Sequence, residues 1–298
     1  MNTSLSAGNV SYGPRAIKRA RRSKSEIQQI EEAIYQTLEA DHPQTLRGLF
    51  YQLESQGVIP KTQMAYKTVG RLCVEMRKRD ALPYAWLADS TRWMRKPKTH
   101  SGLTALADLT ARTYRRALWD DQFAYVEVWC EKDALAGVLL EETDPWDVPL
   151  MVTRGYPSLT YMYEAAQKIA NTDKPTFIYY LGDHDPSGID IPRNVEKQLR
   201  QMAPDALLTF TLAVTPEQIQ SFDLPTRPTK SGDTRSRRFV GESVEVDAIP
   251  AHALRRLVHD AILRHVDRET LYYTRVAETS ERAYLQEWAD IVKEHDER

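Results

Sequence analysis

Four short apolar runs in the second half of the chain constrain the fold more than any other feature. They read AYVEVWC, PLMVT, TFIYYLG and LLTFTLAV, at residues 124–130, 149–153, 176–182 and 207–214. Each is rich in β-branched or aromatic residues, and helical segments such as LTYMYEAAQKIA separate them. Alternating strands and helices predict parallel βαβ units, and nearly continuous apolar strands predict a sheet covered on both faces. The second half is therefore predicted to be an α/β domain.

The first half shows helical periodicity instead. The expected helices are at 25–40, from about 45, at about 62–79 and at about 103–118. Ser25 and Gln28 form a capping box at the start of the first helix. Between the third and fourth helices, YAWLADSTRWMRKPK reads as two short strands around the turn DST. Three helices followed by a basic, aromatic hairpin predict a winged helix.

The chain has 298 residues, of which 42% are hydrophobic and 28% are charged, an ordinary globular composition. The patterns above divide it into three regions. We expect a basic N-terminal arm over 1–24, a winged-helix DNA-binding domain over 25–120, and an α/β domain with C-terminal helices over 121–298. No apolar run approaches the roughly 20 residues that span a bilayer, and the N-terminus lacks the apolar core of a signal peptide. We therefore expect an intracellular, cytoplasmic protein with no membrane partner.

Acidic residues follow two of the predicted strands, at the sheet edge where parallel α/β domains bind ligands. Glu131 follows the first run, and Asp183 and Asp185 follow the third. Extended backbone sends Asp183 and Asp185 to the same side, and Pro186 and Gly188 are typical of a tight turn. Three carboxylates at one edge repel one another, and a hard cation such as Mg²⁺ relieves that repulsion. The alternative interpretation is a strand-ending turn that binds no metal.

Four motifs resemble a known family. In order, VWCEKDAL, GYP, LGDHDPSGIDI and VEVDAIP are similar to the toprim domain of the topoisomerase VI A subunit and its meiotic double-strand-break relative. In that family a glutamate and an Asp-x-Asp hold Mg²⁺, and the matching residues are Glu131, Asp183 and Asp185. The family also has a winged-helix (CAP-like) domain with a nucleophilic tyrosine after an arginine. TLRGLFYQLE matches this pair with Tyr51 and Arg47, and the resemblance covers roughly residues 25–290.

Helix geometry supports the choice of Tyr51 independently. At about 100° per residue, Tyr51 points roughly 140° away from the apolar stripe of its helix. Arg47 lies four residues earlier on the same face, where its guanidinium could favour a phenolate and bind a phosphate. The alternative is a surface or interface tyrosine. Gly48, where the family prefers a larger residue, costs about 1 kcal/mol in helix propensity, or else leaves room for the DNA backbone.

Basic residues of the third helix and the hairpin predict a DNA-binding surface. These residues are Lys67, Arg71, Lys78, Arg79, Arg92, Arg95, Lys96 and Lys98. Lys132, beside the first acidic residue, is a further candidate phosphate contact or equally a solvated charge. Binding through phosphates predicts weak sequence preference and strong salt dependence. Three other residues are interpreted as structural: His184, which alternation turns away from the two aspartates, and Cys73 and Cys130, which match no metal or disulfide pattern.

The resemblance implies a type IIB topoisomerase A-subunit-like transesterase that makes Mg²⁺-dependent double-strand breaks through a 5′-phosphotyrosyl link. It also implies a homodimer on double-stranded DNA, in which the tyrosine of one protomer works with the metal site of the other. No Gly-rich phosphate loop occurs, so we expect no ATP site, and a topoisomerase would need a separate ATP-binding B-type subunit. Two alternatives stay open: a hydrolytic toprim nuclease of a defence system, and a DNA-binding protein without catalysis.

Overall fold

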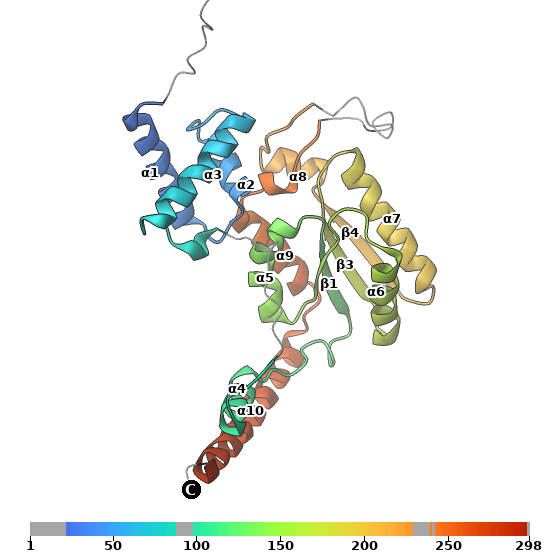
Figure 1. The fold of residues 1–298 in the computed structure, drawn as a ribbon. Coiled ribbons are helices and arrows are strands. Elements are labelled where there is room, and N and C mark those ends of the chain that lie inside the picture. The colour runs from blue at the N-terminus through green and yellow to red at the C-terminus, as the bar shows by residue number, and fades with distance from the viewer. Residues whose placement is uncertain (1–21, 88–97, 229–238, 240–241, 297–298) are drawn as a thin grey trace, which may run out of the picture.

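The computed structural model describes residues 22–87, 98–228, 239 and 242–296. Figure 1 shows three parts: a three-helix unit, an α/β domain and a projecting two-helix arm. The three-helix unit consists of α1 (Lys24–Ala40), α2 (Leu46–Ser55) and α3 (Gln63–Lys78), which enclose their own apolar core. All three predicted helices are confirmed. The capping box of α1 is formed by Ser23 and Glu26, two residues earlier than predicted.

No winged helix is identified among the described residues. Where the first strand of the hairpin was predicted, Tyr84–Trp86 form a 3-10 helix, and Leu87 makes a single bridge to Gln44. Arg77 donates to the carbonyl oxygens of Tyr84 at 2.6 Å and Leu87 at 3.1 Å, so it occupies acceptors that a partner strand would need. The predicted first strand is therefore wrong. The turn and nearly all of the second strand lie outside the described residues.

The α/β domain contains a parallel sheet of four strands in the order β2-β1-β3-β4. The strands are β1 (Tyr125–Cys130), β2 (Leu150–Val152), β3 (Thr176–Leu181) and β4 (Leu208–Ala213). Cys130 pairs with both Val152 and Leu181, and Leu181 pairs with Ala213. The four strands therefore end together at one edge. This confirms the predicted α/β domain and the strand predicted at each of the four apolar runs.

Helices cover both faces of the sheet, as the continuous apolar strands predicted (Figure 1). On one face lie α5 (Ala136–Thr143) and α9 (Ala251–Leu263), and on the other lie α6 (Leu159–Thr172) and α7 (Pro186–Met202). Neighbouring side chains of β1 serve the two cores: Val128 belongs to the first and Trp129 to the second, both 0% exposed. A short helix, α8 (Pro216–Ser221), follows β4. Cys73 and Cys130 are buried free thiols, which confirms their structural interpretation.

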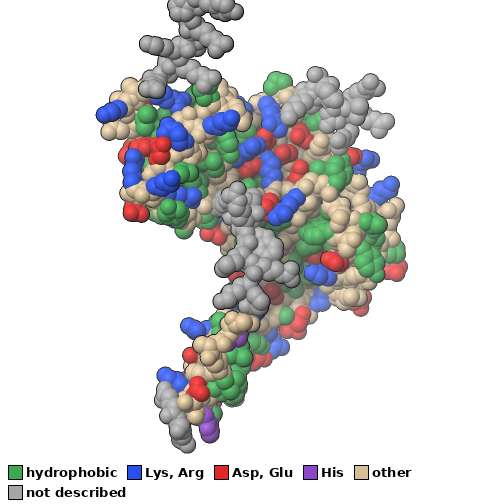
Figure 2. All heavy atoms as spheres, viewed as in Figure 1, with side chains coloured by type: hydrophobic (Ala, Val, Ile, Leu, Met, Phe, Trp, Pro, Cys, Tyr) green, Lys and Arg blue, Asp and Glu red, His purple; other side chains and the backbone are tan. Residues whose placement is uncertain are grey.

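The arm consists of α4 (Leu103–Thr113) and α10 (Arg268–Asp296), which project away from the α/β domain (Figure 1). Their contact is built on small residues, Ala107, Ala111 and Ala289. Figure 2 shows hydrophobic side chains along the arm. The large exposed apolar residues of its outer part are Leu103, Leu106, Leu109, Tyr284, Trp288 and Ile291. None of the described helices is long and apolar enough to cross a membrane.

Candidate active site

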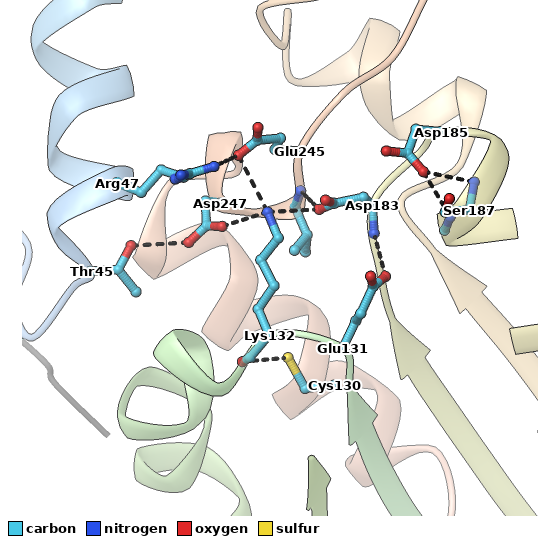
Figure 3. Close-up of polar contacts among 12 residues, drawn as sticks. Thr45, Arg47, Cys130, Glu131, Lys132, Asp183, Asp185, Ser187, Glu245 and Asp247 are labelled. Carbon is cyan, nitrogen blue, oxygen red and sulfur yellow. Dashed lines mark hydrogen bonds and ion pairs between the residues drawn. The ribbon is translucent and has the colours of Figure 1, made fainter. Parts of the chain in front are cut away.

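Glu131 and Asp183 lie side by side at the carboxyl edge of the sheet, as predicted (Figure 3). Glu131 directly follows β1, and its Oε2 accepts a hydrogen bond from the backbone N–H of Asp183 at 3.4 Å. Burial raises the pKa of Glu131, and the negative charge of Asp183 raises it further. Burial likewise raises the pKa of Asp183, although Lys132 acts in the opposite direction. Both carboxylates are therefore harder to ionise than in water, and a nearby cation would stabilise their charged forms.

Asp185 caps the helix that follows it, and its predicted role as a metal ligand stays a prediction. Its Oδ1 accepts hydrogen bonds from the backbone N–H groups of Ser187 at 3.0 Å and Gly188 at 2.7 Å, so it caps α7. Pro186 occupies the first helical position, where its missing N–H costs nothing. The predicted tight turn is therefore wrong: Pro186 and Gly188 begin a helix. A Cβ at Gly188 would lie 2.0 Å from the carbonyl oxygen of Asp183, so only glycine fits here without a backbone shift.

The chemistry of these oxygen donors fits a hard divalent cation, but the side chains do not close around one point. Within the described ranges, no three His, Cys, Asp or Glu residues are grouped as a metal centre. Mg²⁺ is usually held by one or two carboxylates, with waters and phosphate oxygens as its other ligands. Glu131 and Asp183 meet that requirement. Asp185 lies near enough to raise the pKa of Glu131, although burial and Asp183 contribute more.

Lys132 is an internal cation (Figure 3). Its Nζ lies 2.7 Å from Asp247 Oδ2, 2.9 Å from Asp183 Oδ1 and 3.3 Å from Glu245 Oε2. Burial alone would lower the pKa of Lys132, but the three carboxylates outweigh it and the pKa is raised. The side chain is only 19% exposed. Its interpretation as a solvated charge is therefore wrong, and contact with a DNA phosphate would have to compete with these ion pairs.

Sequence reasoning assigned no role to Glu245 and Asp247. They reach the site because His184 and Val244 form an antiparallel bridge, with N–H to O distances of 2.8 and 2.9 Å. His184 is thus structural, as predicted, and its ring also contacts Phe239. Burial opposes the ionisation of Glu245, but Lys132 and two arginines overcome it and lower its pKa to about 2. The motif VEVDAIP, with acids at alternate positions after an apolar residue, was the available signal.

The start of α2 is joined to this acidic cluster. Arg47 Nη1 forms an ion pair with Glu245 Oε2, and Thr45 Oγ1 donates to Asp247 Oδ1 at 3.1 Å. Gly48 is buried at this contact, where a Cβ would lie 3.3 Å from Thr45 Oγ1 and 3.6 Å from the carbonyl oxygen of Asp247. The tighter of these contacts is with Thr45 Oγ1, which caps α2, whereas the distance to Asp247 is an ordinary van der Waals contact.

A second ionic contact holds the three-helix unit against the α/β domain. Arg255 of α9 forms an ion pair with Asp41, at the end of α1, and donates to the carbonyl oxygen of Pro43 at 3.0 Å. The backbone N–H of His252 donates to Asp41 Oδ2 at 3.0 Å. Together with the contacts of Arg47 and Thr45, these bonds fix α2 relative to the carboxyl edge of the sheet.

Tyr51 is half-buried and packs against the cores of both the three-helix unit and the α/β domain. Lys61 Nζ lies 5.7 Å from the centre of its ring. Burial raises the pKa of Tyr51 to about 12, with Glu245 adding to the effect, while Arg47, Arg227 and Lys132 oppose it. Arg47 therefore favours the phenolate, as predicted, but burial outweighs it. The hydroxyl keeps its proton at neutral pH, so an attack by Tyr51 requires transfer of that proton.

Tyr51 lines a pocket of about 250 Å³. Arg47, Lys61, Arg227 and Glu245 line it too. A larger pocket, of about 590 Å³, also borders Arg47 and extends to Lys132 and Asp247. Arg47 lines both pockets, so it connects the pocket of the candidate nucleophile with the pocket that reaches the acidic cluster.

The predicted DNA-binding residues have varied surroundings. Lys67, Arg71, Lys78 and Arg79 are exposed at α3, and Lys98, the last residue of the segment predicted as a hairpin, is exposed too. Arg71 forms an ion pair with Glu75, and Arg79 with Glu31, each at 2.6 Å. Arg92, Arg95 and Lys96, like residues 1–21 of the basic arm, lie outside the described residues. Figure 2 shows Lys and Arg side chains over the three-helix unit, as a DNA-binding surface requires. Binding of duplex DNA there stays a prediction.

Comparisons with known proteins identify no family: no family model matches the chain, and a search of the curated proteins finds no match. The function is therefore inferred from the motifs and from the geometry of the site.

Proposed function

We propose that this protein is a Mg²⁺-dependent DNA transesterase of the topoisomerase VI A-subunit type, with Tyr51 as its nucleophile. One observation carries the proposal: within one chain, a continuous polar network links the wall of the Tyr51 pocket to the carboxyl edge of the sheet. On this proposal Tyr51 therefore acts with the metal site of its own protomer, unlike the arrangement that the resemblance implies. In this network Arg47 pairs with Glu245, and Lys132 joins Glu245 to Asp183. The motif resemblance gives the network its chemistry. On this proposal, the three-helix unit is the core of a winged-helix domain and the α/β domain is a toprim domain.

The reaction exchanges one phosphodiester for another. The Tyr51 oxygen attacks the phosphorus, the bond to the 3′ oxygen breaks, and the 5′ phosphate becomes esterified to Tyr51. The tyrosine proton is lost and the departing 3′ oxygen gains one, so the products are a phosphodiester between Tyr51 and the 5′ end of the DNA and a free 3′-hydroxyl. Arg47 lies on the wall of the same pocket and would orient the phosphate. Two such sites, one on each strand, would produce a double-strand break.

Glu131 and Asp183 would hold Mg²⁺, with Asp185 as the third carboxylate of the motif. The bound ion would neutralise charge that develops on the phosphate. Lys132 keeps Asp183 in place by its ion pair at 2.9 Å, and the backbone N–H of Val246 donates to the same carboxylate at 2.9 Å. These contacts fix one ligand before any metal binds.

Asp183→Asn and Glu131→Gln should each reduce cleavage of supercoiled plasmid in Mg²⁺ or Mn²⁺ by about 100-fold, the usual effect of losing one stabilising group at a reacting phosphate or carbonyl. Both changes keep the side-chain shape and remove one negative charge. Calorimetry should show weaker Mg²⁺ binding by both variants. Glu164→Gln, at an exposed acid of α6, is the matched control and should cleave normally. Cleavage by Asp183→Asn at the wild-type rate would contradict the assignment.

The raised pKa of Tyr51 favours one alternative. A phenol with a pKa of about 12 is a weak nucleophile at neutral pH, and the same carboxylates could instead serve a hydrolytic nuclease. The two functions differ in one respect. Hydrolysis would survive Tyr51→Phe but not Asp183→Asn, whereas transesterification would survive neither.

A homodimer is part of the proposal, and the arm supports it. A pair of helices cannot bury Leu109, Trp288 and Ile291 by itself, since these residues are 38%, 43% and 57% exposed. A second arm packed against the first would give a four-helix arrangement with twofold symmetry. An ATP-binding B-type partner also stays part of the topoisomerase proposal.

Trp288→Glu should convert the dimer to a monomer at micromolar concentration, because a charge would be placed where the second arm packs. Sedimentation velocity measures the mass, and circular dichroism checks that the helices remain. Leu207→Glu introduces the same charge at an exposed apolar residue next to β4, and this control should stay dimeric. A wild-type monomer at these concentrations would refute this role of the arm.

A further inference from the structure

Three cations and one carboxylate line the pocket beside Tyr51. Glu245 lies between two arginines: Arg47 Nη1 pairs with its Oε2, and Arg227 Nη1 pairs with its Oε1. Glu245 is ionised at neutral pH because its pKa is about 2. Lys61 lines the same pocket and brings a third positive charge. One carboxylate therefore faces three cations, which leaves an excess of two positive charges on the wall of this pocket.

Lys61 and Arg227 come from distant parts of the chain and are brought together here. Lys61, just before α3, donates from Nζ to the carbonyl oxygen of Thr226 at 3.0 Å. Arg227 is held in place by a bridge to Ser243, with N–H to O distances of 2.9 and 2.8 Å. An ammonium has three protons, and the bond to Thr226 uses one of them. The guanidinium of Arg227 has five N–H donors and gives one to Glu245, so both side chains have further donors for an anion in the pocket.

We propose that this pocket is a phosphate site, in which Lys61 and Arg227 hold a DNA phosphate against Tyr51. The ligand class follows from charge and shape. The pocket of about 250 Å³ is large enough for a phosphate group, and its walls carry an ammonium and two guanidinium groups, the donors that bind phosphate most strongly. The proposal rests on the proposed function, since it names the residues that present the reacting phosphate to Tyr51.

Inorganic phosphate is the probe, and the Tyr51 ring is the reporter. The full chain is labelled with ¹³C-tyrosine, and the spectrum of Tyr51→Phe identifies the Tyr51 signal among the 15 tyrosines. Phosphate should shift that signal with saturation, whereas sodium chloride at equal ionic strength should not. Lys61→Gln and Arg227→Gln should each weaken phosphate binding at least 5-fold. Lys197→Gln, at an exposed lysine of α7, should bind phosphate normally.

The result that overturns the proposal is a Tyr51 signal that responds equally to phosphate and chloride, or equally in wild type and in Lys61→Gln. Lys61 is exposed, so its variant tests the site even if Arg227→Gln disturbs the fold through Glu245. Arg227→Lys keeps the charge and should restore part of the binding. The readout requires no cleavage. Phosphate binding without any cleavage would support the phosphate site and count against the transesterase. Cleavage through Tyr51 at the wild-type rate in both Gln variants would support the transesterase and count against the phosphate site.

Discussion

Replacing Tyr51 with phenylalanine should abolish covalent attachment of the protein to DNA, with a loss of at least about 1,000-fold, because only the nucleophilic oxygen is removed. The ring should keep its packing, including the edge contact with Phe50 at 5.6 Å between ring centres. Thermal unfolding and duplex binding should therefore stay close to wild type. The reaction is measured on supercoiled plasmid with Mg²⁺ or Mn²⁺, stopped with strong detergent.

Tyr66→Phe is the matched control, since Tyr66 lines the same pocket and is also half-buried. It should form covalent complexes at nearly the wild-type level. Equal loss in both variants would indicate a general effect on the pocket. Unchanged cleavage in Tyr51→Phe, with free DNA ends, would identify the hydrolytic nuclease instead.

Replacing Lys132 with methionine should lower the free energy of unfolding by about 3 kcal/mol, the lower end of the range for breaking a buried ion pair. Methionine fills similar space but leaves Asp183, Glu245 and Asp247 without their shared cation. The estimate is at the lower end because the side chain keeps 19% exposure. Urea unfolding measures the change. Lys197→Met, at an exposed lysine of α7, should change stability by less than about 0.5 kcal/mol.

The effect of Lys132→Met should depend on pH in a defined direction. The pKa of Glu245 is lowered from 4.5 to about 2, so its contribution to stability is present above about pH 4.5 and is lost as the pH falls towards 2. Removing Lys132 raises that pKa although Arg47 and Arg227 remain, so protonation begins at a higher pH and relieves part of the excess negative charge of the three carboxylates. The stability difference between wild type and variant should therefore be largest at neutral pH and shrink in acid. A difference that grows in acid would contradict this account of the cluster.

Local patterns predicted the parts of the fold that depend on neighbouring residues. All four strands and the helices α1 to α3 followed from apolar periodicity, and the strand ends placed Glu131 and Asp183 at one edge. The start of α7 was misread although its signal was present, because Asp185 followed by Pro186 is typical both of a turn and of a capped helix. Periodicity alone does not separate these two outcomes.

The rest of the site depends on contacts that a linear pattern does not contain. Glu245 and Asp247 reach Lys132 only because the bridge at His184 aligns their segment with the sheet edge. Lys61 and Thr226 are 165 residues apart in the sequence, and their bond helps form the pocket. Gly48 shows the same limit: its cost in helix propensity is visible in the sequence, whereas its burial against the α/β domain, with the Asp247 carbonyl oxygen nearby, is not.

The central claim is that Tyr51 becomes joined to a 5′ phosphate, and the most direct measurement is mass spectrometry of the protein after cleavage. The covalent complex is formed in Mg²⁺, trapped with detergent, and digested with nuclease and trypsin. The account predicts a peptide containing Tyr51 whose mass is increased by a 5′-linked nucleotide, in step with the appearance of 3′-hydroxyl ends. Broken DNA together with unmodified Tyr51, or a nucleotide on another tyrosine, would contradict it.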